Sequence, residues 1–205
     1  DMIQDEKSRK SILKNMLSEV NKLARLIDNL LTISKFENLP TMFKIKRSRL
    51  DLHAIIKECL NDISQEAQAK SISFITNFSE SSIYVEGDKE LITQSIYHLL
   101  SNSVKYSHAE GRVEVSTILS GSLAYIIIRD YGTGIPEKLL NQIYEKFYMI
   151  DAGPDKATRG AGIGLYLVRE IINLHYGNIQ VDSTKGKGTR FTIKLPILFT
   201  GMGQG

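Results

Sequence analysis

The sequence has little of what marks several other classes of protein. It holds one cysteine, Cys59, among its 205 residues, so no disulfide can form within the chain, as in proteins of reducing compartments. The longest strand-like apolar run is "LAYIII", whereas a membrane-spanning helix needs roughly 20 apolar residues. The net charge is only +3, which makes neither nucleic acid nor an anionic membrane an expected partner. We therefore expect a cytoplasmic chain without membrane contact.

The rest of the composition is that of a globular domain. Hydrophobic residues make up 42% of the sequence and charged residues 24%, which provides enough apolar material for a sizeable core. Cys59 stands in the apolar helical stretch "AIIKECL", so we expect it to be buried and not to act as a nucleophile. Because the chain opens with Asp1, we expect a fragment of a longer protein, and whether that parent is anchored in a membrane is left open.

Residues 6–37 carry one long helical pattern. Its apolar seam, spaced alternately three and four residues apart and ending in one polar place, consists of Leu13, Met16, Val20, Leu23, Ile27, Leu30 and Ser34. Such a seam packs either on its own domain or in a helical hairpin that dimerises. The regular heptad, followed by the break at "NLPT", favours the second interpretation.

From residue 43 onward the pattern alternates between strands and helices. We expect strands near residues 43–52, 72–78, 82–87, 112–119, 123–132, 178–184 and 188–196, and helices over 51–69, 88–106, 136–146 and 161–176. Strands that come in pairs with interspersed helices are typical of an α+β fold. We predict a two-layer α/β sandwich, with a mixed sheet and its helices on one face.

The stretch "TRGAGIGLYL" at 158–167 places Gly160, Gly162 and Gly164 at the entrance of a helical pattern. It matches neither the G-x-G-x-x-G dinucleotide fingerprint nor the Walker A motif. Small residues nevertheless allow backbone N–H groups to approach a phosphate, and the following helix would present its positive N-terminus. A tight loop against the sheet, without any ligand, explains the glycines equally well.

A second stretch, "IIIRDYGTGIP", ends an apolar strand with Asp130 and continues through Gly132 and Gly134. Burying a carboxylate is costly unless it finds a hydrogen-bond donor. The amino group of adenine is one such donor. The alternative is an aspartate that merely caps a turn.

The third stretch is "QSIYHLLSNSVKYS". On a helix, His98, Asn102, Lys105 and Tyr106 share one face because they are three or four residues apart. An amide oxygen can bind Mg²⁺, a lysine can meet a phosphate, and a tyrosine can pack beside a nucleotide. A solvated polar face of the helix is the other reading.

Taken together, these stretches resemble the ATP-binding region of sensor histidine kinases, in the superfamily that also includes DNA gyrase, Hsp90 and MutL. In family order, "NSVKYS" resembles the N-box, "DYGTGIP" the G1 box, "IYEKFYMID" the F-box, "RGAGIGLYLV" the G2 box and "GKGTRFTIKLP" the closing segment. "LARLIDNLLTISKFE" resembles the second helix of the dimerisation and phosphotransfer hairpin. The resemblance implies a partial hairpin over 1–39 and a Bergerat-type ATP-binding domain over 40–198, and the stretch "GMGQG" at the end predicts a disordered tail over 199–205.

The resemblance also implies roles for individual residues. Asp130 would bind the adenine amino group, helped by the backbone around Gly132 and Gly134 and supported by Thr189. Asn102 would bind Mg²⁺. The remaining expected ATP-binding residues are His98, Lys105, Tyr106, Phe147, Arg159, Gly160, Gly162, Gly164 and Leu165, of which Phe147 would anchor the mobile ATP lid that the glycines end.

Some positions depart from the family pattern. His98 stands where many relatives have asparagine and where gyrase-like branches have a water-activating glutamate, so transfer to a nucleophile other than water is favoured. Met149 replaces an arginine of many relatives, and Lys156 or Arg159 is a candidate substitute. None of His53, His98, His108 and His175 lies in a phosphoacceptor box, so we expect the acceptor histidine on a helix outside this sequence.

Three functions follow from these features. The leading one is the catalytic region of a sensor histidine kinase that uses ATP and Mg²⁺, forms a homodimer through its hairpin and serves a response regulator. The second is a non-catalytic nucleotide-binding or dimerisation module of a degenerate kinase. The third is a gyrase-like ATPase, which the absent carboxylate disfavours.

Overall fold

The computed structural model describes residues 8–10, 12–13, 16–17, 20, 24, 27, 31, 45–150 and 162–198. Contacts between residues divide the chain into two units, Asp1–Lys44 and Ile45–Gly205. The expected tail at 199–205 lies outside the described residues. Within the described ranges, no helix combines the length and the apolar character needed to cross a membrane.

In the first unit, every described residue from 8 to 31 is helical, as the heptad pattern predicts. Leu13, Met16, Val20 and Ile27 of the seam are each more than half exposed. Leu23, Leu30 and Ser34 lie outside the described residues. At its described positions the seam is therefore an exposed apolar stripe. Such a stripe is typical of a helix that packs against a partner helix.

The second unit is built on a five-stranded sheet with the strand order β2-β4-β5-β7-β6. The strands are β2 (Ser73–Asn77), β4 (Arg112–Ser120), β5 (Leu123–Asp130), β6 (Asn178–Thr184) and β7 (Gly188–Pro196). β2 pairs with β4 in parallel and the other pairs are antiparallel, so the sheet is mixed as expected. β1 (Ser48–Asp51) and β3 (Tyr84–Gly87) form a separate antiparallel pair.

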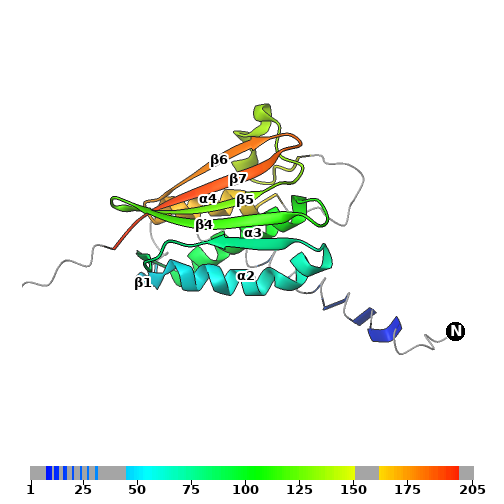
Figure 1. Cartoon of the computed structure of the whole chain (residues 1–205), viewed down its shortest axis with the longest axis horizontal. Coiled ribbons are helices and arrows are strands. Elements are labelled where there is room, and N and C mark those ends of the chain that lie inside the picture. Colours follow the sequence, from blue (N-terminus) through cyan, green and yellow to red (C-terminus); the bar gives the residue numbers. More distant parts are fainter. Residues whose placement is uncertain are drawn as a thin grey trace, which may run out of the picture. The chain divides into compact units, whose positions relative to one another are not determined.

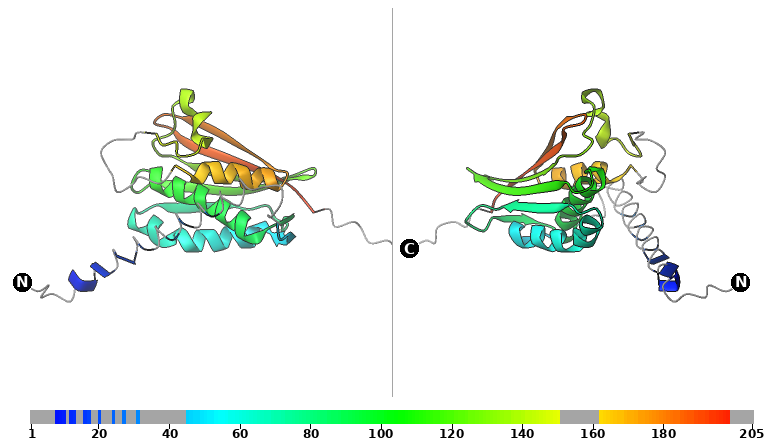
Figure 2. Two further views of the ribbon diagram at one scale, coloured as in Figure 1. Left: turned by 180° about the vertical axis from the view of Figure 1, so that it is seen from behind. Right: turned by 45° about the vertical axis from the view of Figure 1, so that its right-hand side comes forward.

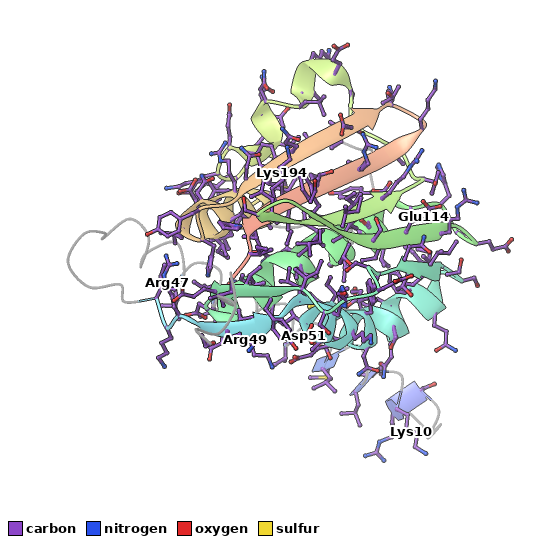
Figure 3. The ribbon with its side chains drawn as sticks, turned by 60° about the vertical axis from the view of Figure 1, so that its left-hand side comes forward. Lys10, Arg47, Arg49, Asp51, Glu114 and Lys194 are labelled. Atoms are coloured by element: carbon purple, nitrogen blue, oxygen red, sulfur yellow. The ribbon has the colours of Figure 1, made fainter. Side chains whose placement is uncertain are left out.

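Three helices, α2 (Leu52–Ala69), α3 (Lys89–Tyr106) and α4 (Gly164–Leu174), cover one face of the sheet (Figures 1 and 2). The predicted two-layer architecture is thereby confirmed. Along β4 and β7, buried residues alternate with less buried ones. Charged side chains such as Glu114 of β4 and Lys194 of β7 occupy the less buried positions (Figure 3).

Aspartate side chains fix where the first two of these helices begin. Asp51 Oδ1 accepts hydrogen bonds from the backbone N–H groups of His53 and Ala54, at N···O distances of 2.9 and 3.3 Å. Asp88 caps α3 in the same way, through the backbone N–H groups of Glu90 and Leu91. Each cap satisfies N–H groups that have no partner inside the helix.

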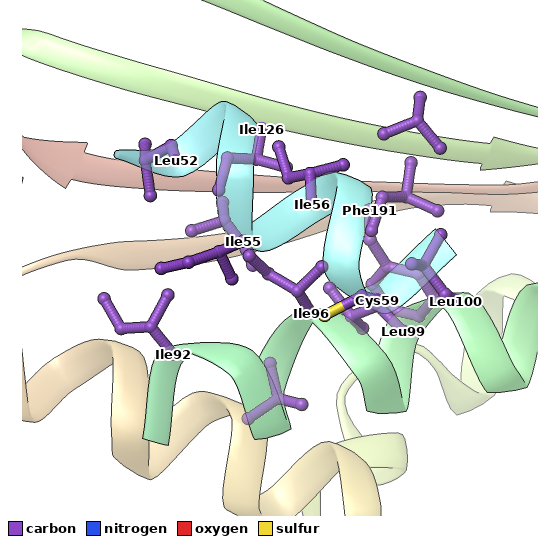
Figure 4. Close-up of a cluster of buried hydrophobic side chains, with 14 of the residues drawn as sticks. Leu52, Ile55, Ile56, Cys59, Ile92, Ile96, Leu99, Leu100, Ile126 and Phe191 are labelled. Atoms are coloured by element: carbon purple, nitrogen blue, oxygen red, sulfur yellow. The ribbon is translucent and has the colours of Figure 1, made fainter. Parts of the chain in front are cut away.

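The core lies between the helices and the sheet. Figure 4 shows Cys59 of α2 among apolar side chains of α2, α3 and the sheet. Cys59 is fully buried, and burial raises the pKa of its thiol to about 12. The prediction of a buried core cysteine is thus confirmed, because a thiol with this pKa carries almost no reactive thiolate at neutral pH.

Hydrogen bonds join the start of α3 to the end of α4. The backbone N–H of Asp88 donates to His175 Nε2 at 2.9 Å, while His175 Nδ1 donates to the carbonyl oxygen of Ile171 at 2.7 Å. Arg47 Nη2, just before β1 (Figure 3), donates to the carbonyl oxygen of Leu174 at 3.1 Å. The two helices are therefore tied together at the ends away from the predicted site.

Two expected elements differ in the structure. The helix predicted over 136–146 is wrong: this segment forms two 3₁₀ turns, η1 (Glu137–Leu139) and η2 (Gln142–Tyr144). Ile143 and Tyr144 are the buried residues of these turns, so too little apolar surface is buried to stabilise a continuous helix. The strand predicted over 43–52 is limited to β1, where β3 provides a partner.

Candidate functional site

Asp130 is the last residue of β5, and it continues the buried face of that strand. Ala124, Ile126 and Ile128 point to the helices, and the period of two places the carboxylate on the same side. The side chain is 3% exposed. Sequence alternation thus puts an acid where the core would otherwise have an apolar residue.

The Asp130 carboxylate is held by backbone N–H groups from two elements. Gly132 donates to Asp130 Oδ1 with an N···O distance of 3.0 Å, and Thr189 at the start of β7 donates to the same oxygen at 3.2 Å. Among the described residues, these side-chain bonds end on Oδ1, which leaves Oδ2 able to accept from a ligand. Burial raises the pKa of Asp130, and the two N–H bonds act in the opposite direction.

The turn after Asp130 is packed against α3 without room for side chains. A Cβ atom on Gly132 would lie 2.0 Å from the carbonyl oxygen of Tyr106, the last residue of α3. The same carbonyl oxygen accepts a hydrogen bond from the backbone N–H of Thr133 at 3.1 Å. On the other side, a Cβ atom on Gly134 would lie 2.0 Å from the carbonyl oxygen of Thr184. The turn therefore locks the end of α3 to the β6–β7 hairpin.

The polar face of α3 runs from His98, in the middle of the helix, to Tyr106, which packs on this turn. His98 and Asn102 are half-buried, and Tyr106 is exposed. Lys105 Nζ lies 4.8 Å from the centre of the Tyr106 ring. His98 adjoins the start of α4, since its Nδ1 is 3.3 Å from the position of a Cβ atom on Gly164. The structure thus brings His98 and the beginning of the G2 helix together.

The start of α4 differs from the starts of α2 and α3. Its N-cap residue is Ile163, which makes no side-chain capping bond. Gly164 opens the helix and Leu165 follows, within the range 161–176 expected from the sequence. The first N–H groups of α4 consequently lack the carboxylate that caps the other two helices, and they are suited to an external anion.

In the glycine-rich stretch, Gly162 is packed closely against the backbone of Phe147 and Tyr148. Its φ is +69°, and a Cβ atom would lie 2.6 Å from the carbonyl carbon of Phe147 and 2.8 Å from the carbonyl oxygen of Tyr148. Phe147 also has a positive φ, of 63°, and its side chain is 62% exposed. Its expected role as a lid anchor stays a prediction. Arg159, Gly160 and Lys156 lie outside the described residues.

The comparisons with known proteins agree with this geometry. The family described as "Histidine kinase-, DNA gyrase B-, and HSP90-like ATPase" matches residues 87–198, which is more than half of the chain. This chain belongs to that family. The matched range begins just before α3 and ends just after β7, so it includes the described site residues.

Individual members of the family cover more of the chain. The sensor histidine kinase WalK of Bacillus subtilis is 32% identical over 181 residues, which are 87% of this chain and 29% of WalK. This chain therefore spans less than a third of that relative. Among solved structures, a mycobacterial sensor histidine kinase, MprB, has a TM-score of 0.65 at 26% identity and covers 74% of this chain and 97% of its own. The Acinetobacter baumannii histidine kinase AdeS has a TM-score of 0.73 at 24% identity over 96% of this chain and 87% of its own, which shows the fold alone.

Membership of this ATPase family supports the use of ATP by the chain. Among the described residues, no group of three or more His, Cys, Asp or Glu side chains could hold a metal ion. The expected role of Asn102 as a metal ligand stays a prediction.

Sequence reasoning missed Ser183 of β6. Its Oγ accepts from the backbone N–H of Ile135 and donates to the carbonyl oxygen of Gly188, both at 2.8 Å, and lies 2.9 Å from Thr189 Oγ1. Ser183 thus joins the G1 turn to the start of β7, beside the Asp130 pocket. In the sequence it is one polar residue of a strand, and only the long-range pairing gives it this place.

An open groove of about 510 Å³ lies elsewhere on the unit, between β6, α4 and the 3₁₀ turns. Its lining residues are Leu140, Asn141, Tyr144, Arg169, Ile179, Gln180, Val181 and Asp182. None of the expected ATP-binding residues lines it. The candidate site is instead the polar edge formed by the ends of α3 and β5 and the starts of β7 and α4.

Proposed function

We propose that this chain is the ATP-binding catalytic region of a sensor histidine kinase, and that it transfers the γ-phosphate of ATP to a histidine outside this sequence. The observation that carries the proposal is the buried Asp130 carboxylate, held on one oxygen by the backbone N–H groups of Gly132 and Thr189. A family member with such a carboxylate beside its glycine turn has an acceptor for the amino group of a purine.

Asp130, Gly132, Gly134 and Thr189 form the adenine end of the site. Asp130 Oδ2 accepts from the exocyclic amino group, while Oδ1 keeps its two backbone donors. The close packing of the G1 turn on α3 holds the carboxylate in place without the ligand. The recognition is therefore pre-organised, which reduces the entropy lost on binding.

The phosphate end of the site lies along α3 and the start of α4. No side chain caps the N–H groups at Gly164 and Leu165, so they donate to the phosphate oxygens. Asn102 contributes an amide oxygen to Mg²⁺, and Lys105 adds a positive charge beside Tyr106. When bound, Mg²⁺ supplies charge neutralisation to the triphosphate.

The reaction breaks the bond from the γ-phosphorus to the β,γ-bridging oxygen and forms a bond to a histidine nitrogen, with ADP as the leaving product. His98 occupies the position beside the phosphate end where water-activating relatives have a carboxylate, so this chain lacks there the carboxylate that activates water in those relatives. A response regulator is the next acceptor of the phosphoryl group. The exposed heptad seam is the contact through which the parent protein forms a homodimer.

The test is calorimetric titration of the chain with ATP, ADP and adenosine, with and without Mg²⁺. Asp130→Asn should weaken all three about ten- to hundredfold, because a hydrogen bond to a charged acceptor is lost and an amide N–H then faces the amino group. Asn102→Ala should weaken ATP mainly when Mg²⁺ is present. Asp182→Asn, an exposed aspartate on β6, is the matched control and should change nothing. Tight ATP binding that is unaffected by Asp130→Asn would show that the adenine pocket is assigned wrongly.

A further inference from the structure

Lys70 lies directly after α2 and reaches to the end of α3. Its Nζ donates to the carbonyl oxygen of Val104 at 3.1 Å and to that of Lys105 at 2.6 Å. The last carbonyl groups of a helix have no partner within the helix, and a cation at this end also meets the negative pole of the helix. Lys70 therefore closes the final turn of α3 from outside.

That final turn carries the phosphate side of the proposed site. Lys105 and Tyr106 belong to it, and Asn102 lies one turn earlier. The carbonyl oxygen of Tyr106 accepts from Thr133 N–H and is packed directly against Gly132. A displacement of this turn would consequently move the N-box side chains and the G1 turn relative to each other.

The neighbouring backbone holds Lys70 in position for this contact. The carbonyl oxygen of Lys70 accepts from the backbone N–H of Glu110 at 2.9 Å, and Ser73 N–H donates to the carbonyl oxygen of Gly111 at 3.0 Å. The turn after α2 is thus fastened to the turn after α3. Burial lowers the pKa of Lys70, and the positive charge of Lys105 lowers it further. The two carbonyl groups replace part of the hydration that the ammonium group of Lys70 loses.

We propose that Lys70 is a positioning residue for the phosphate side of the nucleotide site, acting through the last turn of α3. The inference rests on the proposed function, since it assigns Lys70 to the same site. Lys70 itself touches the helix backbone and not the nucleotide. Loss of its ammonium group loosens the turn that presents Asn102 and Lys105, whereas the Asp130 pocket keeps its own backbone bonds.

The test compares Lys70→Met with the wild type in titrations with adenosine, ADP and ATP in the presence and absence of Mg²⁺. Methionine keeps the apolar stem and removes the donor. We expect affinity for Mg-ATP to fall about three- to tenfold, which corresponds to losing a cation at a helix C-terminus. Adenosine should bind as it does to the wild type, because its contacts are at the Asp130 end.

Two control variants separate positioning from general stability. Lys70→Arg keeps donors for the two carbonyl groups and should restore Mg-ATP affinity. Lys89→Met removes a lysine from the opposite end of α3, where it pairs with Glu58, and should leave the affinity unchanged. Hydrogen exchange of the free protein should increase at residues 104–107 and at Thr133, whose N–H donates to Tyr106, but not at Gly132, whose N–H donates to Asp130, in Lys70→Met without any nucleotide present.

Each outcome decides the inference. Equal losses for adenosine and Mg-ATP would mean that Lys70 only stabilises the fold, and an unchanged Mg-ATP affinity would also overturn the proposal. If Lys70→Met does not fold, Lys70→Gln is measured in its place with the same expectations. A wild-type chain that binds no adenine nucleotide would overturn the proposed function, and the hydrogen exchange comparison would still test whether Lys70 holds the end of α3.

Discussion

At the scale of single residues, two opposing effects act on the ionisation of Asp130. It is 3% exposed, which disfavours the charged carboxylate, yet it receives two backbone N–H donors, which favour that charge. Burial is the larger effect, so the pKa of Asp130 is raised above its ordinary value of 3.8. The group therefore stabilises the fold fully below pH 3.8 and loses this contribution as the pH rises through the raised pKa.

A ligand amino group should reverse this balance. A third donor, on Oδ2, favours the ionised carboxylate, so ADP binding should lower the pKa of Asp130, and affinity should rise as the pH rises through its raised value. Carboxyl-carbon NMR titrations with and without saturating ADP would measure the change, with the exposed Asp182 as an internal control. An Asp130 pKa that stays the same or rises in the complex would contradict the adenine contact.

At the scale of elements, the three helices of the second unit begin in two different ways. Asp51 and Asp88 cap α2 and α3, whereas Ile163 leaves α4 without a side-chain cap. The sequence reveals the caps because aspartate followed by an apolar period is a local signal. At α4 no side chain caps the helix, and the phosphate end of the site stays a prediction.

Other features could not be predicted, because they depend on long-range contacts. Position 162 has no room for a side chain because the backbone of Phe147 and Tyr148 lies beside it, and this neighbour exists only in the folded chain. Lys70 and Ser183 join elements that are 34 and 48 residues apart in the sequence, respectively. The predicted helix over 136–146 failed for a related reason, since apolar spacing indicated a helix but tertiary packing buries only one short stretch of it.

The heptad helix of the first unit allows a separate prediction. Its described seam residues are more than half exposed, so a charge at the seam should disrupt association without affecting the second unit. Val20→Glu should shift any dimer to monomer in light scattering, whereas Ser18→Glu, on the opposite side of the heptad, should not. An unchanged mass for Val20→Glu would mean that the seam is not the contact between two copies.

At the scale of the whole molecule, the two units have separable tasks in the proposed function. The second unit contains the described nucleotide-site residues, and the family match at 87–198 falls entirely within it. The first unit supplies a helix that resembles part of the phosphotransfer hairpin. Nucleotide binding should therefore require only the second unit, while phosphoryl transfer requires an acceptor histidine that is brought in line with the γ-phosphate.

Incubation with γ-labelled ATP tests the transfer most directly. The chain is assayed alone and together with a separately expressed helical hairpin that carries a histidine in the family's phosphoacceptor box. We predict acid-labile, alkali-stable label on the hairpin, no such label on this chain alone, and strongly reduced label on the hairpin with the Asp130→Asn variant. Stoichiometric acid-labile label on this chain alone, or release of free phosphate with an unlabelled hairpin, would contradict the account.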